Sequence, residues 1–243
     1  MPILKPAYAV LLLALAACTT LPNDPAEPNS AYRAAISDAA VASPRKIVAL
    51  LAQPPAETLS VVSLMSANKL PSCSKDALPC VVTLGDRPLW VTLSGEVQVL
   101  CRRWKLRGEQ LQRRLDQLLG MPVDPPSQYR EAVFVEFRVA RQNLARPCLG
   151  VDASDPARPV CTLDAQPTTP ATLRALVGRQ MAESYVVDRL GAPGYPFTRL
   201  GYTYDWAPTA RADHYGASEF IVTPTSTVEA VAVVSTDDYC RTP

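Results

Sequence analysis

His214 is the only histidine of the chain, so it limits the nucleophilic chemistry that this sequence can perform. A serine or cysteine hydrolase with a catalytic triad needs a histidine as its base. Asp205 and Asp213 precede His214 and Ser218 follows it, but this order and spacing match no hydrolase pattern, and no Gly-x-Ser-x-Gly motif occurs. The sequence therefore predicts a loop histidine between two strands rather than a catalytic base.

Two glutamates in predicted strands, Glu136 and Glu219, are candidates for carboxylate chemistry. Glycoside hydrolases use a pair of carboxyl groups about 5 to 10 Å apart, one as acid and the other as base or nucleophile. The separation of two strands in space cannot be read from the sequence, so glycoside hydrolysis stays an open alternative.

Seven cysteines are present, of which six follow Cys18. An even number in an exported chain favours three disulfides over free thiols. Proximity along the chain pairs the first two and the fourth with the fifth, which leaves the third for the last: Cys73 with Cys80, Cys148 with Cys161, and Cys101 with Cys240. The chain has no Cys-x-x-Cys motif and a single histidine, so no metal site is predicted.

Leu15, Ala16 and Ala17 precede Cys18 at the end of an apolar run that is too short to span a bilayer. This segment resembles the lipobox of bacterial lipoproteins. The resemblance implies cleavage before Cys18 and acylation of its sulfur and amino group with fatty acids such as palmitate, which anchors the protein permanently in a membrane. Thr19, where lipoproteins retained in the inner membrane commonly carry Asp, favours the periplasmic face of the outer membrane.

The expected organisation is a signal peptide over 1–17, a lipidated cysteine and proline-rich tether over 18–30, and one domain over 31–243. The chain carries 24 Lys and Arg against 23 Asp and Glu, which argues against nucleic acid as a partner. With 24 prolines and only 10 glycines, it favours rigid loops over flexible linkers. The expected partners are the membrane, through Cys18, and a protein or glycan of the cell envelope.

The segment Ser218–Pro224 (SEFIVTP), with the following 225–231, is similar to the strand and turn that carry the catalytic glutamate of ADP-ribosyltransferases. The similarity implies NAD as cofactor and Glu219 as the glutamate that binds the nicotinamide ribose. An upstream arginine would hold the dinucleotide, and Arg138 and Arg199 are the candidates. Ala217 stands where this family usually has Gln or Glu.

Aromatic residues concentrate between Tyr195 and Tyr215. In an extended strand, Tyr202, Tyr204 and Trp206 share one face, and the residues at its edge are Tyr195, Arg199 and Tyr215. Tyrosine and tryptophan are typical of binding surfaces, although the same alternation is expected of a strand that packs on a core. Because no catalytic constellation is complete, the sequence favours a binding or envelope-interaction module without a cofactor over the NAD-using enzyme.

Hydrophobic periodicity predicts the elements that position these residues. Helices are expected over 31–42, 44–52, 95–119 and 170–190, and strands over 59–65, 81–84, 89–93, 131–140, 195–206, 218–222 and 228–234. This order predicts an α+β fold in which an antiparallel sheet packs with two long helices and is stapled by about three disulfides.

The predicted helix over 95–119 carries six cations that lie mainly off its apolar stripe: Arg102, Arg103, Lys105, Arg107, Arg113 and Arg114. They form either a solvated helix face or a patch for lipid phosphates, anionic glycans or an acidic partner. Both interpretations remain open at the level of sequence.

Overall fold

The computed structural model describes residues 28–66, 77–122, 132–186 and 194–241. The fold is α+β, as predicted. Its main sheet is antiparallel, with seven strands in the order β2–β11–β4–β1–β3–β10–β5. The strands are β1 (Thr58–Ser66), β2 (Cys80–Thr83), β3 (Leu89–Leu93), β4 (Ala132–Ala140), β5 (Leu144–Ala145), β10 (Phe220–Val222) and β11 (Thr227–Ser235).

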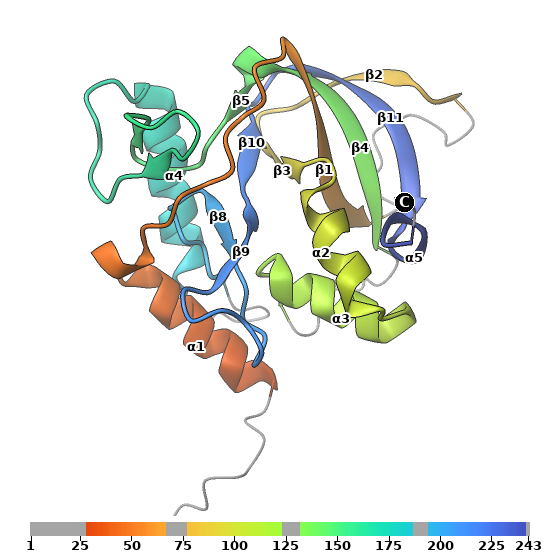
Figure 1. Cartoon of the computed structure of the whole chain (residues 1–243). Helices are drawn as coiled ribbons and strands as arrows, with labels where there is room; N and C mark the ends of the chain where they lie inside the picture. The colour runs from red at the N-terminus through yellow and green to blue at the C-terminus, as the bar shows by residue number, and fades with distance from the viewer. Residues whose placement is uncertain (1–27, 67–76, 123–131, 187–193, 242–243) are drawn as a thin grey trace, which may run out of the picture.

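Two short hairpins and five helices complete the described chain. The hairpins are β6 (Val151–Asp152) with β7 (Val160–Cys161), and β8 (Tyr202–Tyr204) with β9 (Tyr215–Ser218). The helices are α1 (Pro28–Ala40), α2 (Glu96–Trp104), α3 (Gly108–Leu118), α4 (Ala171–Ser184) and α5 (Thr236–Tyr239). Figure 1 shows α2 and α3 in front of the curved sheet, with α1, α4 and the two hairpins gathered beside it.

The sheet buries a different cluster on each face. Val61, Val135 and Phe137 belong to a cluster contributed by strands, which the curvature of the sheet brings together. Their neighbours Val62 and Phe134 point to the opposite face and pack against α2, α3 and α5. The alternation along β1 and β4 is the two-residue period expected of a sheet that is covered on both faces.

Two of the predicted disulfides are confirmed. Cys101 of α2 is bonded to Cys240 after α5, and Cys148 is bonded to Cys161 of β7. Cys80 is also disulfide-bonded, and its predicted partner Cys73 lies outside the described residues. The Cys101 disulfide ties the end of the chain to α2 across 139 residues of sequence.

The single long helix predicted over 95–119 is wrong, because the chain breaks between Trp104 and Gly108. Lys105 and Gly108 both have positive φ, at 54° and 53°, and this left-handed geometry ends α2 and redirects the chain into α3. The apolar periodicity continues across the break, so Val97 of α2 and Leu111 of α3 belong to the same buried cluster.

Two other expected elements are much shorter than predicted. The helix expected over 44–52 is only a 3₁₀ turn, Pro44–Lys46, capped by Ser43, and Leu50 instead donates its N–H to the carbonyl of Pro159. The strand expected over 195–206 is reduced to β8, because Arg199 and Gly201 have positive φ and the chain turns there. A side chain at Gly201 would meet the sulfur of Cys161 at 2.9 Å, so this turn requires glycine.

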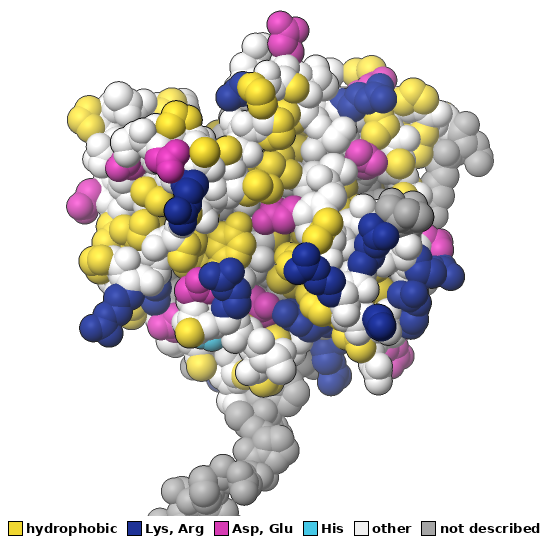
Figure 2. Space-filling model, in the orientation of Figure 1, with side chains coloured by type: hydrophobic (Ala, Val, Ile, Leu, Met, Phe, Trp, Pro, Cys, Tyr) yellow, Lys and Arg dark blue, Asp and Glu magenta, His cyan; other side chains and the backbone are white. Residues whose placement is uncertain are grey.

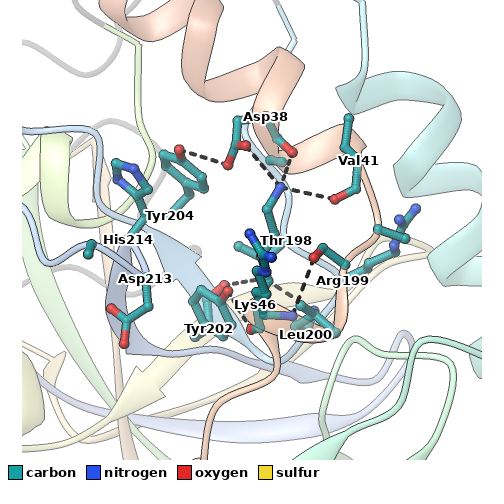
Figure 3. A pocket seen from close by; sticks show the side chains of 15 residues that line it. Asp38, Val41, Lys46, Thr198, Arg199, Leu200, Tyr202, Tyr204, Asp213 and His214 are labelled. Atoms are coloured by element: carbon teal, nitrogen blue, oxygen red, sulfur yellow. Dashed lines mark hydrogen bonds and ion pairs between the residues drawn. The ribbon is translucent and has the colours of Figure 1, made fainter.

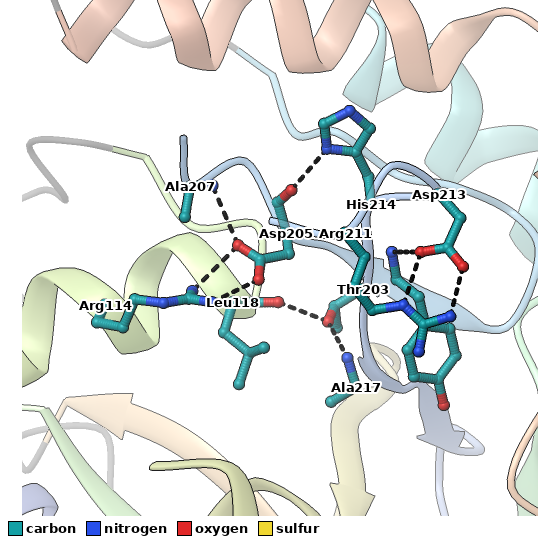
Figure 4. Close-up of polar contacts among 10 residues, drawn as sticks. Arg114, Leu118, Thr203, Asp205, Ala207, Arg211, Asp213, His214 and Ala217 are labelled. Atoms are coloured by element: carbon teal, nitrogen blue, oxygen red, sulfur yellow. Dashed lines mark hydrogen bonds and ion pairs between the residues drawn. The ribbon is translucent and has the colours of Figure 1, made fainter. Parts of the chain in front are cut away.

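A buried ion pair attaches α3 to β8. Arg114 of α3 makes two hydrogen bonds to the carboxylate of Asp205, at 3.0 and 2.6 Å, and the same carboxylate accepts from the N–H of Ala207 (Figure 4). Next to it, Thr203 donates its hydroxyl to the carbonyl of Leu118 at 2.7 Å. The Arg114 and Asp205 side chains are only 16% and 5% exposed, so neither charge has much water to replace a lost partner.

We expect Asp205→Ala to destabilise the fold by about 3 kcal/mol, because Arg114 then keeps a desolvated charge without a partner. Urea unfolding monitored by circular dichroism measures this loss. The matched control is Glu229→Ala, which breaks the exposed pair with Arg138 and is expected to cost no more than about 1 kcal/mol. Equal losses in the two variants would contradict a structural role for the buried pair.

Candidate functional site

Glu219 lies at the point where the chain passes from the small hairpin to the main sheet. It is the single residue between β9 and β10, and its N–H donates to the carbonyl of Gly201 at 2.9 Å. Ser218 before it donates its N–H to the Glu96 carboxylate at 2.9 Å, while Phe220 after it is fully buried in the cluster of strand residues. Because successive side chains of an extended segment point to opposite sides, the Glu219 side chain points away from that of Phe220.

A cavity of about 680 Å³, named here the Glu219 cavity, lies against this glutamate. Four regions line it: the ends of β1 and β3 with the loop before β3, the segment after α3, one side of α4, and 195–197 with β8. The half-buried face of α4, which carries Leu176, therefore looks onto the cavity rather than into a closed core.

One wall of the Glu219 cavity is aromatic. Trp90 of β3 and Phe197 meet edge to face with ring centroids 5.7 Å apart. Tyr195 also lines the cavity and is 39% exposed. At the rim lie two exposed arginines and two exposed carboxylates, Arg87 and Arg179 with Asp86 and Glu183.

The electrostatics of Glu219 are unusual for a surface cleft. Its Oε2 atom is buried and has no hydrogen-bond partner among the described residues. Burial raises the pKa of Glu219 to about 8, so the carboxyl is protonated at neutral pH. A protonated carboxyl can both donate and accept, and it can also release its proton to a basic ligand group.

The arginines predicted to accompany Glu219 lie elsewhere. Arg138 is exposed on β4 and pairs with Glu229 at 3.4 Å. Arg199 is buried, donates to the carbonyl of Ala40 and lies over the ring of Tyr185. Neither is among the residues that line the Glu219 cavity in the described chain, where Arg87 and Arg179 are found instead.

The predicted aromatic face is used for packing. Tyr202, Tyr204 and Trp206 are 1%, 5% and 6% exposed. Trp206 donates its indole N–H to the carbonyl of Met121 and packs edge to face with Tyr32 of α1. The structure thus buries all three residues, but Tyr204 and Trp206 pack with α1 whereas Tyr202 belongs to a separate cluster with Leu50 and Leu200.

A second pocket of about 250 Å³, the α1 pocket, is lined by Tyr202, Tyr204 and Arg199 (Figure 3). Its polar atoms bond one another. Tyr204 donates to Asp38 at 3.0 Å, Tyr202 donates to the carbonyl of Lys46 at 2.9 Å, and Lys46 pairs with Asp38 at 3.1 Å. This arrangement attaches α1 to β8 and leaves less capacity for a ligand than the Glu219 cavity does.

Tyr215, placed at the edge of the predicted face, is half-buried with its ring 5.2 Å from that of Tyr202. Its hydroxyl bonds to Ser218 and donates to Glu96. The Glu96 carboxylate is buried, which raises its pKa, and it holds β9 against the start of α2.

His214 does not form a triad with the acids and serine near it in sequence. Its ring stacks on Tyr204, and its Nδ1 bonds to the backbone carbonyl of Asp205 at 2.9 Å (Figure 4). Asp213 pairs with Arg211, and Ser218 bonds to Tyr215. Glu136 accepts from Ser94 and is not a lining residue of the Glu219 cavity in the described chain.

Sequence reasoning singled out Glu219 and, within the aromatic face, Tyr195 and Tyr204, which also line the Glu219 cavity, but it missed most of the other lining residues. Trp90 and Phe197 are separated by more than one hundred residues, and Leu176 comes from a helix whose apolar stripe also fits a core. The only available signal was that Trp90 and Glu219 fall in or next to segments predicted as strands.

No known protein family matches the chain, and neither curated proteins nor solved structures give a significant match. Within the described residues, no helix is both long and apolar enough to cross a membrane. Likewise, the described part of the chain has no cluster of three or more histidine, cysteine or acidic side chains that could hold a metal ion.

The raised pKa of Glu219 predicts a specific pH dependence. Because the folded state favours the protonated form, this residue makes the fold less stable as pH rises from about 5 through about 8. Asp116 and Glu96, whose pKa values are also raised by burial, act in the same direction, so the comparison with a variant isolates Glu219.

We expect Glu219→Gln to be more stable than the wild type at pH 9, by roughly 1 to 3 kcal/mol, and to lose this advantage at pH 5. Urea unfolding across this pH range measures the difference. If the difference in unfolding free energy between the two proteins were the same at every pH from 5 to 9, Glu219 would ionise as an ordinary exposed carboxyl.

Proposed function

We propose that this protein is a lipid-anchored binding protein on the periplasmic face of the outer membrane, and that the Glu219 cavity is its ligand site. The observation that carries the proposal is the buried Glu219 oxygen, which has no partner among the described residues at the wall of a cavity of about 680 Å³. A buried polar atom without a hydrogen bond costs about 1 to 3 kcal/mol. A ligand group that bonds to it recovers part of that cost.

The lining of the cavity favours a small ligand with an apolar face and polar groups at its edges. Trp90 and Phe197 offer aromatic surface, Glu219 offers a hydrogen bond, and Arg87 and Arg179 offer cations for a carboxylate. Apolar surface next to polar groups that fix the orientation of a ligand is typical of small-molecule sites. Within the cell envelope, glycan fragments that carry amide and carboxylate groups fit this description.

Trp90 provides a direct test, because it lines the cavity whereas Trp104 and Trp206 do not. We expect soluble peptidoglycan fragments to change tryptophan fluorescence in a saturable way, and Trp90→Phe to abolish this change. Glu219→Ala should weaken binding at least tenfold, since it removes the polar contact. Glu57→Ala, a change at an exposed glutamate away from the cavity, is the matched control.

Saturable binding that is the same in Glu219→Ala and Glu57→Ala would exclude the cavity as the site. The absence of any response to the fragments would exclude this ligand class.

The anchor rests on the segment Leu15–Cys18, which lies outside the described residues. We expect wild-type protein expressed in a bacterial host to incorporate labelled palmitate and to fractionate with the outer membrane. Cys18→Ala should lose both properties, because its side chain cannot form a thioether. Sedimentation of the unlabelled Cys18→Ala protein with intact membrane after a salt wash would contradict lipid anchoring.

A second candidate function is ADP-ribosyl transfer from NAD, which is supported by the position of Glu219 at a cleft that also contains Arg87 and Arg179. In this proposal, Glu219 contacts the nicotinamide ribose and a rim arginine contacts the phosphates, in place of Arg138 or Arg199. We expect nicotinamide release from NAD by the wild type and at least a hundredfold slower release by Glu219→Gln. If neither protein releases nicotinamide, this candidate is excluded.

A further inference from the structure

The two helices in front of the sheet carry an unbalanced charge. From Glu96 to Leu118 the sequence has six arginines and lysines and three acids, of which only Glu109 is exposed, although the whole chain has a net charge of only +1. One of these cations, Arg114, turns inward to pair with Asp205. The other five are exposed and define the α2–α3 basic surface: Arg102, Arg103, Lys105, Arg107 and Arg113.

Figure 2 shows Lys and Arg side chains gathered over α2 and α3 on the face that it displays. None of the five cations forms an ion pair within the described residues; the carboxylates of α5 nearby are engaged with Arg241 and with the N–H of Gly108. Five exposed cations that outnumber the carboxylates around them produce a positive potential that attracts anions.

Helix stability explains only part of this surface. Arg102 and Arg103 lie in the last turn of α2, where cations interact favourably with the helix dipole. Arg107, however, is the N-cap residue of α3 and makes no side-chain capping bond. A cation at this end of a helix is unfavourable, and serine, threonine or aspartate is usual there. The Asp237 carboxylate instead accepts from the N–H of Gly108 at 3.2 and 3.3 Å, so the stability of α3 gives no reason for a cation at Arg107.

An exposed apolar side chain accompanies these cations. Val99 is 49% exposed and precedes Arg102 and Arg103 by three and four residues, which places it on the same side of α2. Val99 therefore adds a small apolar area beside the cations of α2.

The proposed anchor brings this surface close to a membrane. Pro28, the first residue of α1, follows Cys18 by ten residues, which span at most about 35 Å even when fully extended. One turn later, Tyr32 donates its hydroxyl to the carbonyl of Gly120, two residues after the end of α3. The point where the tether enters the domain is therefore in contact with the segment that follows α3.

We propose that the α2–α3 basic surface binds the anionic headgroups of the membrane that holds the lipid anchor, and so orients the domain on it. This inference rests on the proposed anchoring at Cys18. The headgroup phosphates match the guanidinium groups in charge and hydrogen-bonding geometry. The acyl chains hold the protein at the membrane, and the basic surface determines which side of the domain faces it.

The test uses the full mature chain with Cys18→Ala, so that acyl chains cannot contribute. We expect it to sediment with phosphatidylcholine vesicles that contain phosphatidylglycerol but not with vesicles of phosphatidylcholine alone. It should dissociate from the anionic vesicles as the salt concentration rises to about 0.5 M. Arg102→Gln/Arg103→Gln/Arg113→Gln should lower the partition coefficient at least tenfold. Arg45→Gln/Arg141→Gln/Arg158→Gln, which neutralises three exposed arginines on other elements, should retain most of the binding.

The proposal would be overturned if the two triple variants bound equally well, or if the protein did not bind the anionic vesicles. It would also be overturned if the surface captured a soluble acidic glycan or peptide saturably in place of vesicles, because the surface would then belong to a different partner. Circular dichroism of both variants establishes that they fold. Palmitate labelling of the wild type in cells tests the anchor separately, so failure of the anchor and failure of the basic surface give different results.

Discussion

The alternation of side chains along Ser218, Glu219 and Phe220 is the constraint on which the candidate site depends. Ser218 is held by the Glu96 carboxylate at the start of α2, and Phe220 is buried in the strand cluster beneath the guanidinium of Arg146, 4.2 Å from its ring centroid. These two attachments hold the chain on either side of Glu219, and the Glu219 side chain points to the side opposite that of Phe220. Glu219 therefore faces the cavity because the contacts of Ser218 and Phe220 hold the chain in place. Its unbonded oxygen costs about 1 to 3 kcal/mol.

The aromatic residues near Glu219 have a different role, since they connect α1 to the body of the domain. Tyr204 bonds to Asp38, and Trp206 packs against Tyr32, so the face of α1 is held by hydrogen bonds as well as by apolar contact. Burial raises the pKa of Tyr202 and Tyr204 well above that of a free phenol, so these hydroxyls remain donors at any physiological pH.

Local patterns predicted the sheet better than they predicted the turns. The alternation in β1, β4 and β11 has one cause, burial on both faces, and it is visible in the residues themselves. The break in the helix at Lys105 could not be predicted in this way, because lysine seldom adopts positive φ and the apolar periodicity continues through the break. The cavity was also invisible, since Trp90, Phe197 and Glu219 meet only after distant segments pack, whereas Glu219 itself was recognised from the residues that follow it.

The rotation of α3 about its axis links the two proposed surfaces. The Arg114–Asp205 pair fixes this rotation, and because consecutive helical residues are about 100° apart, Arg113 must then project in a different direction, where it is exposed. The same helix leads directly into Leu119, Gly120 and Met121, which line the Glu219 cavity. A domain held on a membrane through α2 and α3 would thus present the mouth of the cavity at a fixed angle to that membrane, because a single helix positions both surfaces.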